Sequence, residues 1–142
     1  MTAQQIIDRL QLIRHPEGGW FRETWRAPAP EGQRASGTCI FFLLPEGEAS
    51  HWHRVDATEI WLYHAGAPLI LSLSADETGP ATDHLLTPDL DQGLPQLIVP
   101  EQHWQAARST GAYTLVSCTV SPGFDFAGFT LAPPDFDIPR GR

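Results

Sequence analysis

The chain has 142 residues, a formal net charge of −8 and nine basic residues, all of them arginine. This length fits one domain, residues 1–142, and the acidic balance argues against nucleic-acid or membrane-surface partners, which need a basic face. Hydrophobic residues make up 42% of the chain, and 12 Gly and 13 Pro supply many turns, which favours many short strands over a helix bundle. No apolar run approaches the ~20 residues of a membrane-spanning helix, and the first residues are too polar for a signal peptide. Two cysteines lie in apolar runs, which favours buried free thiols. Because free thiols are typical of a reducing compartment, we expect a cytoplasmic protein.

The chain opens with a helix, predicted over residues 1–15, which Thr2 caps and His15-Pro16 ends. Its apolar stripe at helical spacing consists of Ile6, Ile7, Leu10 and Ile13. Short runs of β type then alternate with breaks that contain Gly and Pro. The predicted strands are Trp20–Arg26, Thr38–Leu44, His51–Arg54, Glu59–His64, Leu69–Ser74, Asp83–Leu86, Gln96–Val99, Trp104–Ala107, Tyr113–Val120 and Gly128–Leu131. About ten short strands at this spacing predict a sandwich or barrel, followed by a loose or surface-draped tail over residues 133–142.

The stretch from Ser50 to Gly66 carries most of the chemical information. His51 and His53 are two residues apart, so on a regular strand both imidazoles point to the same face. Glu59 begins the next strand after a short polar turn. Two imidazoles and a carboxylate form a divalent-metal set with open positions for water or substrate. Without a metal, a pocket histidine is poised to move a proton near neutral pH. His51, His53 and Glu59 are therefore the candidate catalytic residues.

The same residues carry a family resemblance. His51, His53, Glu59 and Gly66 resemble the first motif of the cupin superfamily, and Pro100–Gln105 resembles its second motif, of Pro-x-Gly-x-x-His type. The stretches that narrow the resemblance to the small cupin 5 family are His15–Arg26, Glu59–Trp61 and Pro122–Phe129. The resemblance reaches from the first helix to about Ala132. It implies an all-β double-stranded β-helix (a jelly roll) with a short N-terminal helix, usually paired into homodimers, and it implies no particular reaction.

The second motif departs from the family pattern at two positions. Gln102 stands in place of the turn glycine, and Gln105 stands in place of the last histidine. A glutamine amide is a poorer ligand than imidazole for a borderline metal. The candidate metal set is therefore His51, His53, Glu59 and Gln105, holding one divalent ion (Zn, Fe, Mn or Ni) or none. His103, two residues before Gln105, is a substitute ligand or a residue of the pocket mouth.

Three further residues are candidates for binding a substrate together with Gln105. Trp61 and Tyr63 share the face of Glu59 on a regular strand, and aromatic walls beside a few polar groups suit a small polar, sugar-like ligand. Arg22 has the chemistry to clamp a carboxylate or phosphate, with a surface or dimer ion pair as its other interpretation. The stretch Gly19–Arg26 also weakly resembles the first barrel strand of the dTDP-sugar epimerases, which share the jelly roll and abstract a proton with a histidine.

Three functions stay open at this point. The first is an enzyme that isomerises or epimerises a small polar, sugar-like metabolite. The second is a non-catalytic module that binds a small molecule in the same pocket, and the third is a metal-dependent dioxygenase. Large apolar residues also predict a symmetric homodimer, with Trp25, Phe41 and Trp52 as candidates for its buried face.

Overall fold

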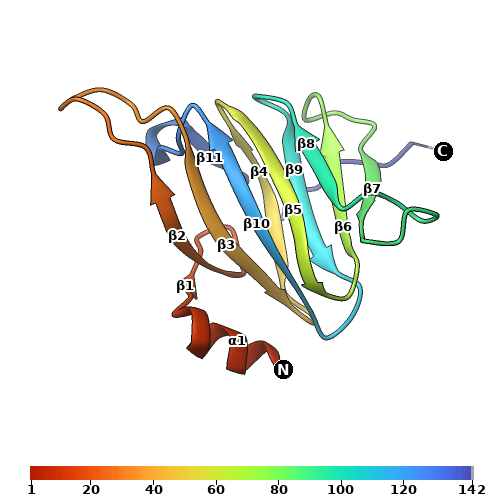
Figure 1. Ribbon diagram of the computed structural model, residues 1–142. Helices are drawn as coiled ribbons and strands as arrows, with labels where there is room; N and C mark the ends of the chain where they lie inside the picture. The colour runs from red at the N-terminus through yellow and green to blue at the C-terminus, as the bar shows by residue number, and fades with distance from the viewer. Residues whose placement is uncertain (142) are drawn as a thin grey trace.

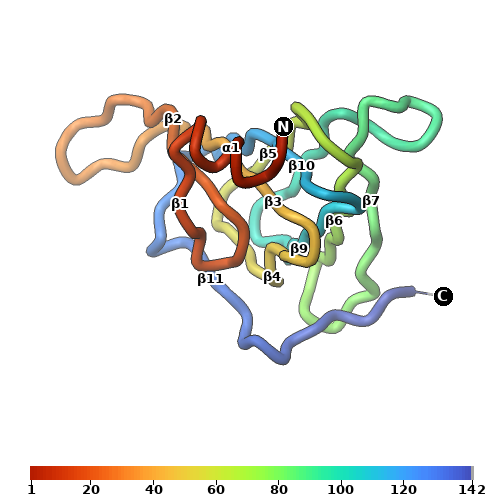
Figure 2. Tube along the Cα trace, turned by 90° about the horizontal axis from the view of Figure 1, so that it is seen from below, coloured from red at the N-terminus to blue at the C-terminus, as the bar shows by residue number. Residues whose placement is uncertain are grey.

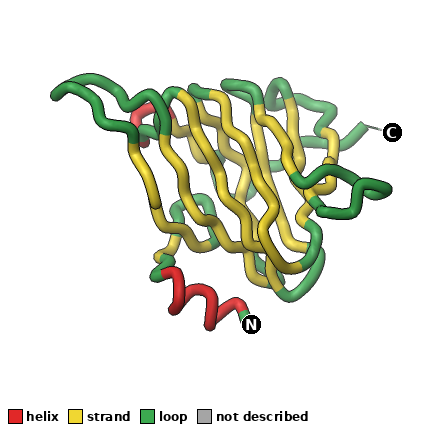
Figure 3. Tube along the Cα trace, in the orientation of Figure 1, coloured by secondary structure: helices red, strands yellow, loops and turns green. Residues whose placement is uncertain are grey.

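The computed structural model describes residues 1–141, and Arg142, the last residue of the predicted tail, lies outside the described part. Two antiparallel sheets face each other (Figure 1), and strands make up most of the chain (Figure 3). The first sheet contains, in spatial order, β1 (Ile13–Arg14), β2 (Trp20–Arg26), β3 (Thr38–Pro45), β10 (Tyr113–Ser121), β5 (Thr58–Gly66) and β8 (Gln96–Val99). The second contains β11 (Phe129–Leu131), β4 (Ala49–Val55), β9 (Trp104–Ser109), β6 (Leu69–Ser74) and β7 (Thr82–Leu86). All ten predicted strands are present, with small shifts at their ends.

The N-terminal helix is shorter than predicted. Helix α1 spans Ala3–Leu10 and begins with a capping box between Thr2 and Gln5. It ends because Gln11 takes a left-handed conformation, with φ of 55°, and its backbone N–H bonds the carbonyls of the last turn. Ile13 and Arg14 then pair with β2 as strand β1 instead of extending the helix. No helix within residues 1–141 has the length and apolar character that a bilayer crossing requires.

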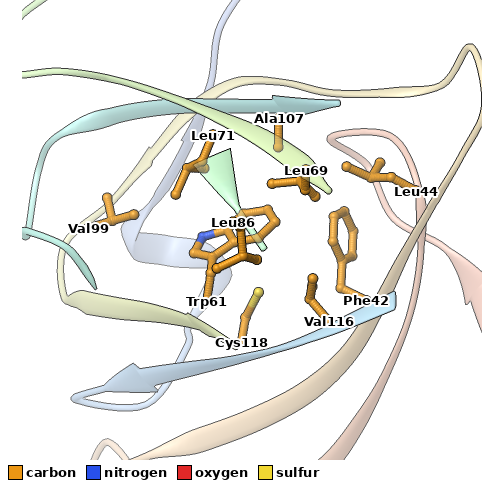
Figure 4. Close-up of a cluster of buried hydrophobic side chains, with 10 residues drawn as sticks. All are labelled: Phe42, Leu44, Trp61, Leu69, Leu71, Leu86, Val99, Ala107, Val116 and Cys118. Atoms are coloured by element: carbon orange, nitrogen blue, oxygen red, sulfur yellow. The ribbon is translucent and has the colours of Figure 1, made fainter. Parts of the chain in front are cut away.

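The hydrophobic core lies between the two sheets. Figure 4 shows Phe42, Trp61, Val116 and Cys118 from the first sheet pointing inward toward Leu69 and Leu71 of the second. Further members of this cluster are Leu44, Leu86, Val99 and Ala107. These inward side chains alternate with outward ones along their strands, which is the period that the sequence pattern predicts.

The C-terminal segment after β11 is docked onto the second sheet. In Figure 2 it crosses below β4 and ends near the loops of the green strands. Ile138 is fully buried against Trp52 and Trp104, and the Trp52 indole N–H donates to Asp137 at 2.8 Å. The segment is therefore surface-draped as predicted, but it is not loose.

Strand β4 is irregular at the position that matters most. Its pairing with β9 shifts register between Ser50 and His53. As a result Ser50 and His53, three residues apart, are both buried on the side of the facing sheet, while His51 turns to the other side. A β-bulge produces this effect, because one extra residue breaks the alternation of side chains.

Candidate functional site

A cavity of about 360 Å³ opens between the sheets near the chain segment that follows α1. Strands of both sheets, the turn before β2 and the loop after β10 supply its walls. The lining residues are His15, Glu17, Phe21, Glu23, Arg26, Thr38, Ile40, His53, Val55, Glu59, Cys118, Val120, Phe124, Asp125 and Phe126. The inner wall holds histidines and carboxyls, and the outer wall is largely aromatic. Such a mixture of apolar walls and a few converging polar groups is typical of a small-molecule site.

Glu59 is held from behind by a chain of hydrogen bonds. The Gln105 side-chain amide donates from Nε2 to Glu59 Oε1 at 2.9 Å, and Gln105 Oε1 accepts the Trp61 indole N–H at 2.9 Å. An indole nitrogen can only donate, so it fixes which end of the Gln105 amide faces Glu59. Trp61 and Gln105 are both almost completely buried. They therefore position Glu59 rather than line the cavity.

His53 presents one ring nitrogen to the cavity as a base. Its Nδ1 lies 2.7 Å from the His51 carbonyl oxygen, which can only accept, so Nδ1 carries the proton. In the neutral ring Nε2 then has a free lone pair, and it lies 3.5 Å from Glu17 Oε1. Burial lowers the pKa of His53, against the opposing charge of Glu59. His53 is therefore a neutral imidazole with Nε2 as its hydrogen-bond acceptor.

Two buried carboxyl groups with raised pKa values share this cavity. Burial raises the pKa of Glu17 from 4.5 to about 8, although the hydrogen bond from the Ser50 hydroxyl opposes the shift. Burial raises the pKa of Glu59 from 4.5 to about 7, opposed mainly by His53. At neutral pH Glu17 therefore keeps its proton and Glu59 populates both forms. Groups that change protonation near the working pH are those that acid–base catalysis needs.

His15 and Glu17 are site residues that the sequence reasoning missed. They belong to the turn at the end of the predicted helix, and neither is among the predicted site residues. The Glu17 backbone N–H donates to His15 Nδ1 at 3.2 Å, and burial together with His53 lowers the pKa of His15 to about 4. Gly18 and Gly19 have φ of 106° and 79°, and a Cβ on Gly18 would collide with the carbonyl of Ala49. A Cβ on Gly19 would meet Phe42 and Leu44 of β3, so the glycine pair, a signal visible in the sequence, lets the turn approach both β4 and β3 closely.

The cavity mouth combines an ion pair with aromatic rings. Arg26 donates to both carboxylate oxygens of Glu23 at 2.8 Å and to the Phe124 carbonyl oxygen at 3.0 Å. The rings of Phe124 and Phe126 stand edge to face, 4.9 Å apart. Phe124 and Phe126 therefore lie at the rim of the cavity.

The structure brings only some of the predicted site residues together. His53 and Glu59 line one cavity, and Gln105 is in contact with Glu59. His51 does not reach them: its Nε2 lies 2.8 Å from the Pro133 carbonyl oxygen, on the side of β4 that the C-terminal segment covers. The expectation of a shared face failed because it assumed a regular strand, and the bulge in β4 removes that regularity.

The remaining predicted ligand-binding residues lie outside the cavity. Arg22 is exposed and donates to the Leu10 carbonyl oxygen at 3.0 Å, which ties β2 to the end of α1. The Tyr63 hydroxyl donates to the Gly66 carbonyl oxygen at 2.6 Å. His103 lies in the turn before β9 and does not line the cavity. Gln102 in that turn has φ of 65°, so it adopts the conformation for which the family motif has glycine.

The predicted metal set does not assemble. Among residues 1–141 no three His, Cys, Asp or Glu side chains form a group suited to a metal ion. His51 faces away, and the Gln105 amide oxygen already accepts the Trp61 indole N–H. His53 and Glu59 alone fall short of the three or four protein donors of ordinary first-row metal sites.

Comparisons with known proteins give matches over most of the chain. Residues 4–132 match the family described as "Cupin superfamily (DUF985)". A hypothetical protein from Leishmania major is 34% identical, with a TM-score of 0.83 over 93% of this chain and 88% of its own. A crystal structure from Shewanella oneidensis is 36% identical, with a TM-score of 0.86 over 93% of this chain and 85% of its own. The comparison with curated proteins found no match.

A more distant likeness extends to a larger enzyme. Oxalate decarboxylase from Bacillus subtilis is 13% identical, with a TM-score of 0.63 over 83% of this chain and 29% of its own. At this identity the likeness concerns the fold alone. Together with the family match it confirms the predicted double-stranded β-helix and the resemblance that the two motifs indicated.

Proposed function

Since this chain belongs to the cupin superfamily, in the family described as DUF985, we propose that its barrel cavity binds a small polar metabolite. The cavity moves a proton on that metabolite, as the site of an isomerase or epimerase does. One observation carries the proposal: the free Nε2 of His53 and the carboxyls of Glu17 and Glu59 meet in one apolar-walled cavity. Burial raises the pKa of Glu17 to about 8 and that of Glu59 to about 7, and it lowers the pKa of His53. Structural packing alone gives no reason to desolvate four such groups, His15 included, side by side.

The proposed step is proton abstraction beside a carbonyl group. His53 Nε2 takes the proton from the carbon, and the electron pair of that C–H bond moves toward the carbonyl oxygen. A protonated carboxyl, Glu59 or Glu17, donates a hydrogen bond or its proton to that oxygen. In isomerisation His53 gives the proton to the former carbonyl carbon, and the carboxylate takes the proton of the hydroxyl on the carbon that was deprotonated, which becomes the new carbonyl. In epimerisation the other carboxyl protonates the opposite face of the same carbon, the enol oxygen returns its proton to the first carboxylate, and proton exchange with solvent resets His53 and the other carboxyl. Gln105 acts as a positioning residue through Glu59.

The direct test is hydrogen exchange on candidate substrates. Aldoses, ketoses and their amino derivatives are incubated with the protein in D₂O, and NMR follows loss of the signal from the C–H next to the carbonyl. We expect exchange with at least one of them, and its loss in His53→Gln but not in the matched variant His51→Gln. Binding without exchange across the panel would establish the non-catalytic module instead.

A metal-dependent reaction, such as that of a dioxygenase, is the competing proposal. Its support is the fold that the chain shares with the oxalate decarboxylase of Bacillus subtilis, an enzyme with Mn(II) centres. A bound Zn, Fe, Mn or Ni would supply Lewis-acid or redox chemistry, but the donor set described above does not fit it, so no step is assigned to it. Element analysis of protein purified without chelators decides between the two. One metal equivalent whose removal abolishes activity would favour the metal reaction.

We also propose that the protein forms a symmetric homodimer and works in the cytoplasm. Two large apolar side chains, Trp25 and Ile98, stay 54% and 56% exposed on the first sheet. Phe41 is half-buried against the α1 cluster, whereas Trp52 lies under the C-terminal segment and cannot reach a partner through that face. Both cysteines are free thiols, which suits a reducing compartment. Light scattering that gives 15.7 kDa, the mass of one chain, would refute the dimer.

A further inference from the structure

Acidic side chains outnumber basic ones in the lining of the cavity. Four acidic residues line it: Glu17 and Glu59 at the inner end, and Glu23 and Asp125 at the mouth. Against them stands one arginine, Arg26. The histidines add no positive charge, because burial keeps His15 and His53 neutral.

Arg26 is already occupied. Its guanidinium makes a two-point contact with Glu23, at 2.8 Å for each bond, and it also donates to the backbone carbonyl of Phe124. A two-point pair of this kind uses the geometry by which arginine otherwise grips a ligand carboxylate or phosphate. An anionic ligand would have to displace Glu23 before it could use this cation. Within the cavity lining no other arginine is available to it.

The walls are suited to the opposite charge. The rings of Phe21, Phe124 and Phe126 line the cavity, and Asp125 sits between the last two in sequence. Aromatic faces attract ammonium groups through the negative charge density above the ring. Inner carboxyl oxygens accept hydrogen bonds from an ammonium in either protonation state, because the carbonyl oxygen of a protonated carboxyl is also an acceptor.

We propose that the cavity selects a ligand bearing a protonated amine, with the apolar part against the phenylalanine rings and the ammonium near the buried carboxyls. This inference rests on the proposed function, since it names the class of metabolite that the same cavity binds. A preference for amines would distinguish this cavity from sites that bind phosphorylated or nucleotide-linked sugars, because the anionic groups of those sugars need unpaired cationic side chains. An amino sugar or an aromatic or alicyclic amine fits both the charge and the volume of about 360 Å³.

The test compares ligands that differ in one group. Glucosamine, glucose and glucuronate form one series, and benzylamine, benzyl alcohol and benzoate form a second. Titration calorimetry measures affinity, and heteronuclear NMR shows whether the shifted signals belong to cavity residues. We expect the amine of at least one series to bind about tenfold tighter than its neutral and anionic partners, which is the effect of one favourable charge interaction.

Two variants with the same charge change sharpen the test. Glu23→Gln removes one mouth carboxylate and frees Arg26, so amine affinity should fall about threefold to tenfold and carboxylate affinity should rise. Glu48→Gln is the matched control, because Glu48 pairs with Arg14 at 2.8 Å outside the cavity. It should leave all affinities unchanged.

The outcomes separate this inference from the function on which it rests. Cavity binding of the neutral or anionic ligand as tight as that of the amine overturns the amine selectivity and leaves the proposed cavity function standing. An equal effect of Glu48→Gln also overturns it, since the preference would then come from overall charge. Failure of all six ligands to shift any cavity signal counts against both proposals.

Discussion

Replacing Glu17 by glutamine should make the protein more stable, by an amount that grows with pH. The folded state holds Glu17 protonated up to a pKa of about 8, whereas its ordinary value is 4.5. Between these values the unfolded chain releases a proton that the folded chain keeps, so stability contributed by the protonated group is full below pH 4.5 and is lost as pH rises toward 8. Glutamine is a neutral isostere of the protonated acid and has no such loss.

The magnitude follows from the linkage relation. Each pH unit in this range costs the wild type about 1.4 kcal/mol relative to Glu17→Gln, so from pH 5 to pH 7 the stability difference should widen by about 3 kcal/mol. Urea unfolding followed by tryptophan fluorescence at several pH values measures it. Glu46→Gln, at an exposed position in the turn between β3 and β4, is the control and should show a flat difference. A flat or shrinking difference for Glu17→Gln would refute the buried, protonated carboxyl.

Three further predictions test other parts of the structure. His53→Ala should abolish proton exchange or ligand binding, as NMR titration can show. His51→Ala should leave both intact and lower the free energy of unfolding by about 1 kcal/mol in urea unfolding, because its hydrogen bond to the Pro133 carbonyl is lost. Equal loss of function in both variants would contradict the assigned faces of β4. Trp61→Phe should leave the Gln105 amide oxygen without its hydrogen-bond donor and lower the free energy of unfolding by about 1–3 kcal/mol. The Gln105 amide can then flip its oxygen and nitrogen next to Glu59, so the pH profile of exchange should shift. An unchanged pH profile would argue against a positioning role for Gln105. Gly66→Ala should lose at least about 1–3 kcal/mol in thermal unfolding, since φ is 90° there and a Cβ would collide with the backbone of β10; a neutral result would show that the β5 end adapts.

Most of the fold was predictable because it depends on local patterns. The alternation of apolar residues and the Gly and Pro breaks determine where strands begin and end, and both sheets are built from the runs so identified. The helix end was misjudged because Ile13 continues the apolar stripe, yet it is 62% exposed in β1. The left-handed conformation of Gln11 ends the helix, and this conformation cannot be predicted from a glutamine at that position.

The candidate site was predictable only where it follows a regular strand. Glu59 and His53 were identified from spacing, but the face of His51 depends on a bulge that arises from pairing with a distant strand. The same limit hid Glu17, whose role depends on Ser50 and His53 on a strand that follows much later in the chain. Long-range contacts of this kind leave no periodic signal in the sequence.

The turn that carries Glu17, residues 15–19, lies between the two-residue edge strand β1 and strand β2 and is not itself part of either sheet. Its backbone is bonded to β4 at one point, from the His51 N–H to the Glu17 carbonyl oxygen at 2.8 Å, and its side chains contact Ser50, His53 and the rings of Phe21 and Phe42. Such a segment is expected to detach locally at a far lower free energy than the central strands need to open. Amide hydrogen exchange should therefore find the site divided: the half on β4 and β5 exchanges with global unfolding, and the half on residues 15–19 exchanges faster. A ligand that touches both halves would reduce this difference in protection. Glu17, one of the two buried carboxyls of the site, would then enter the site only when residues 15–19 dock onto the barrel.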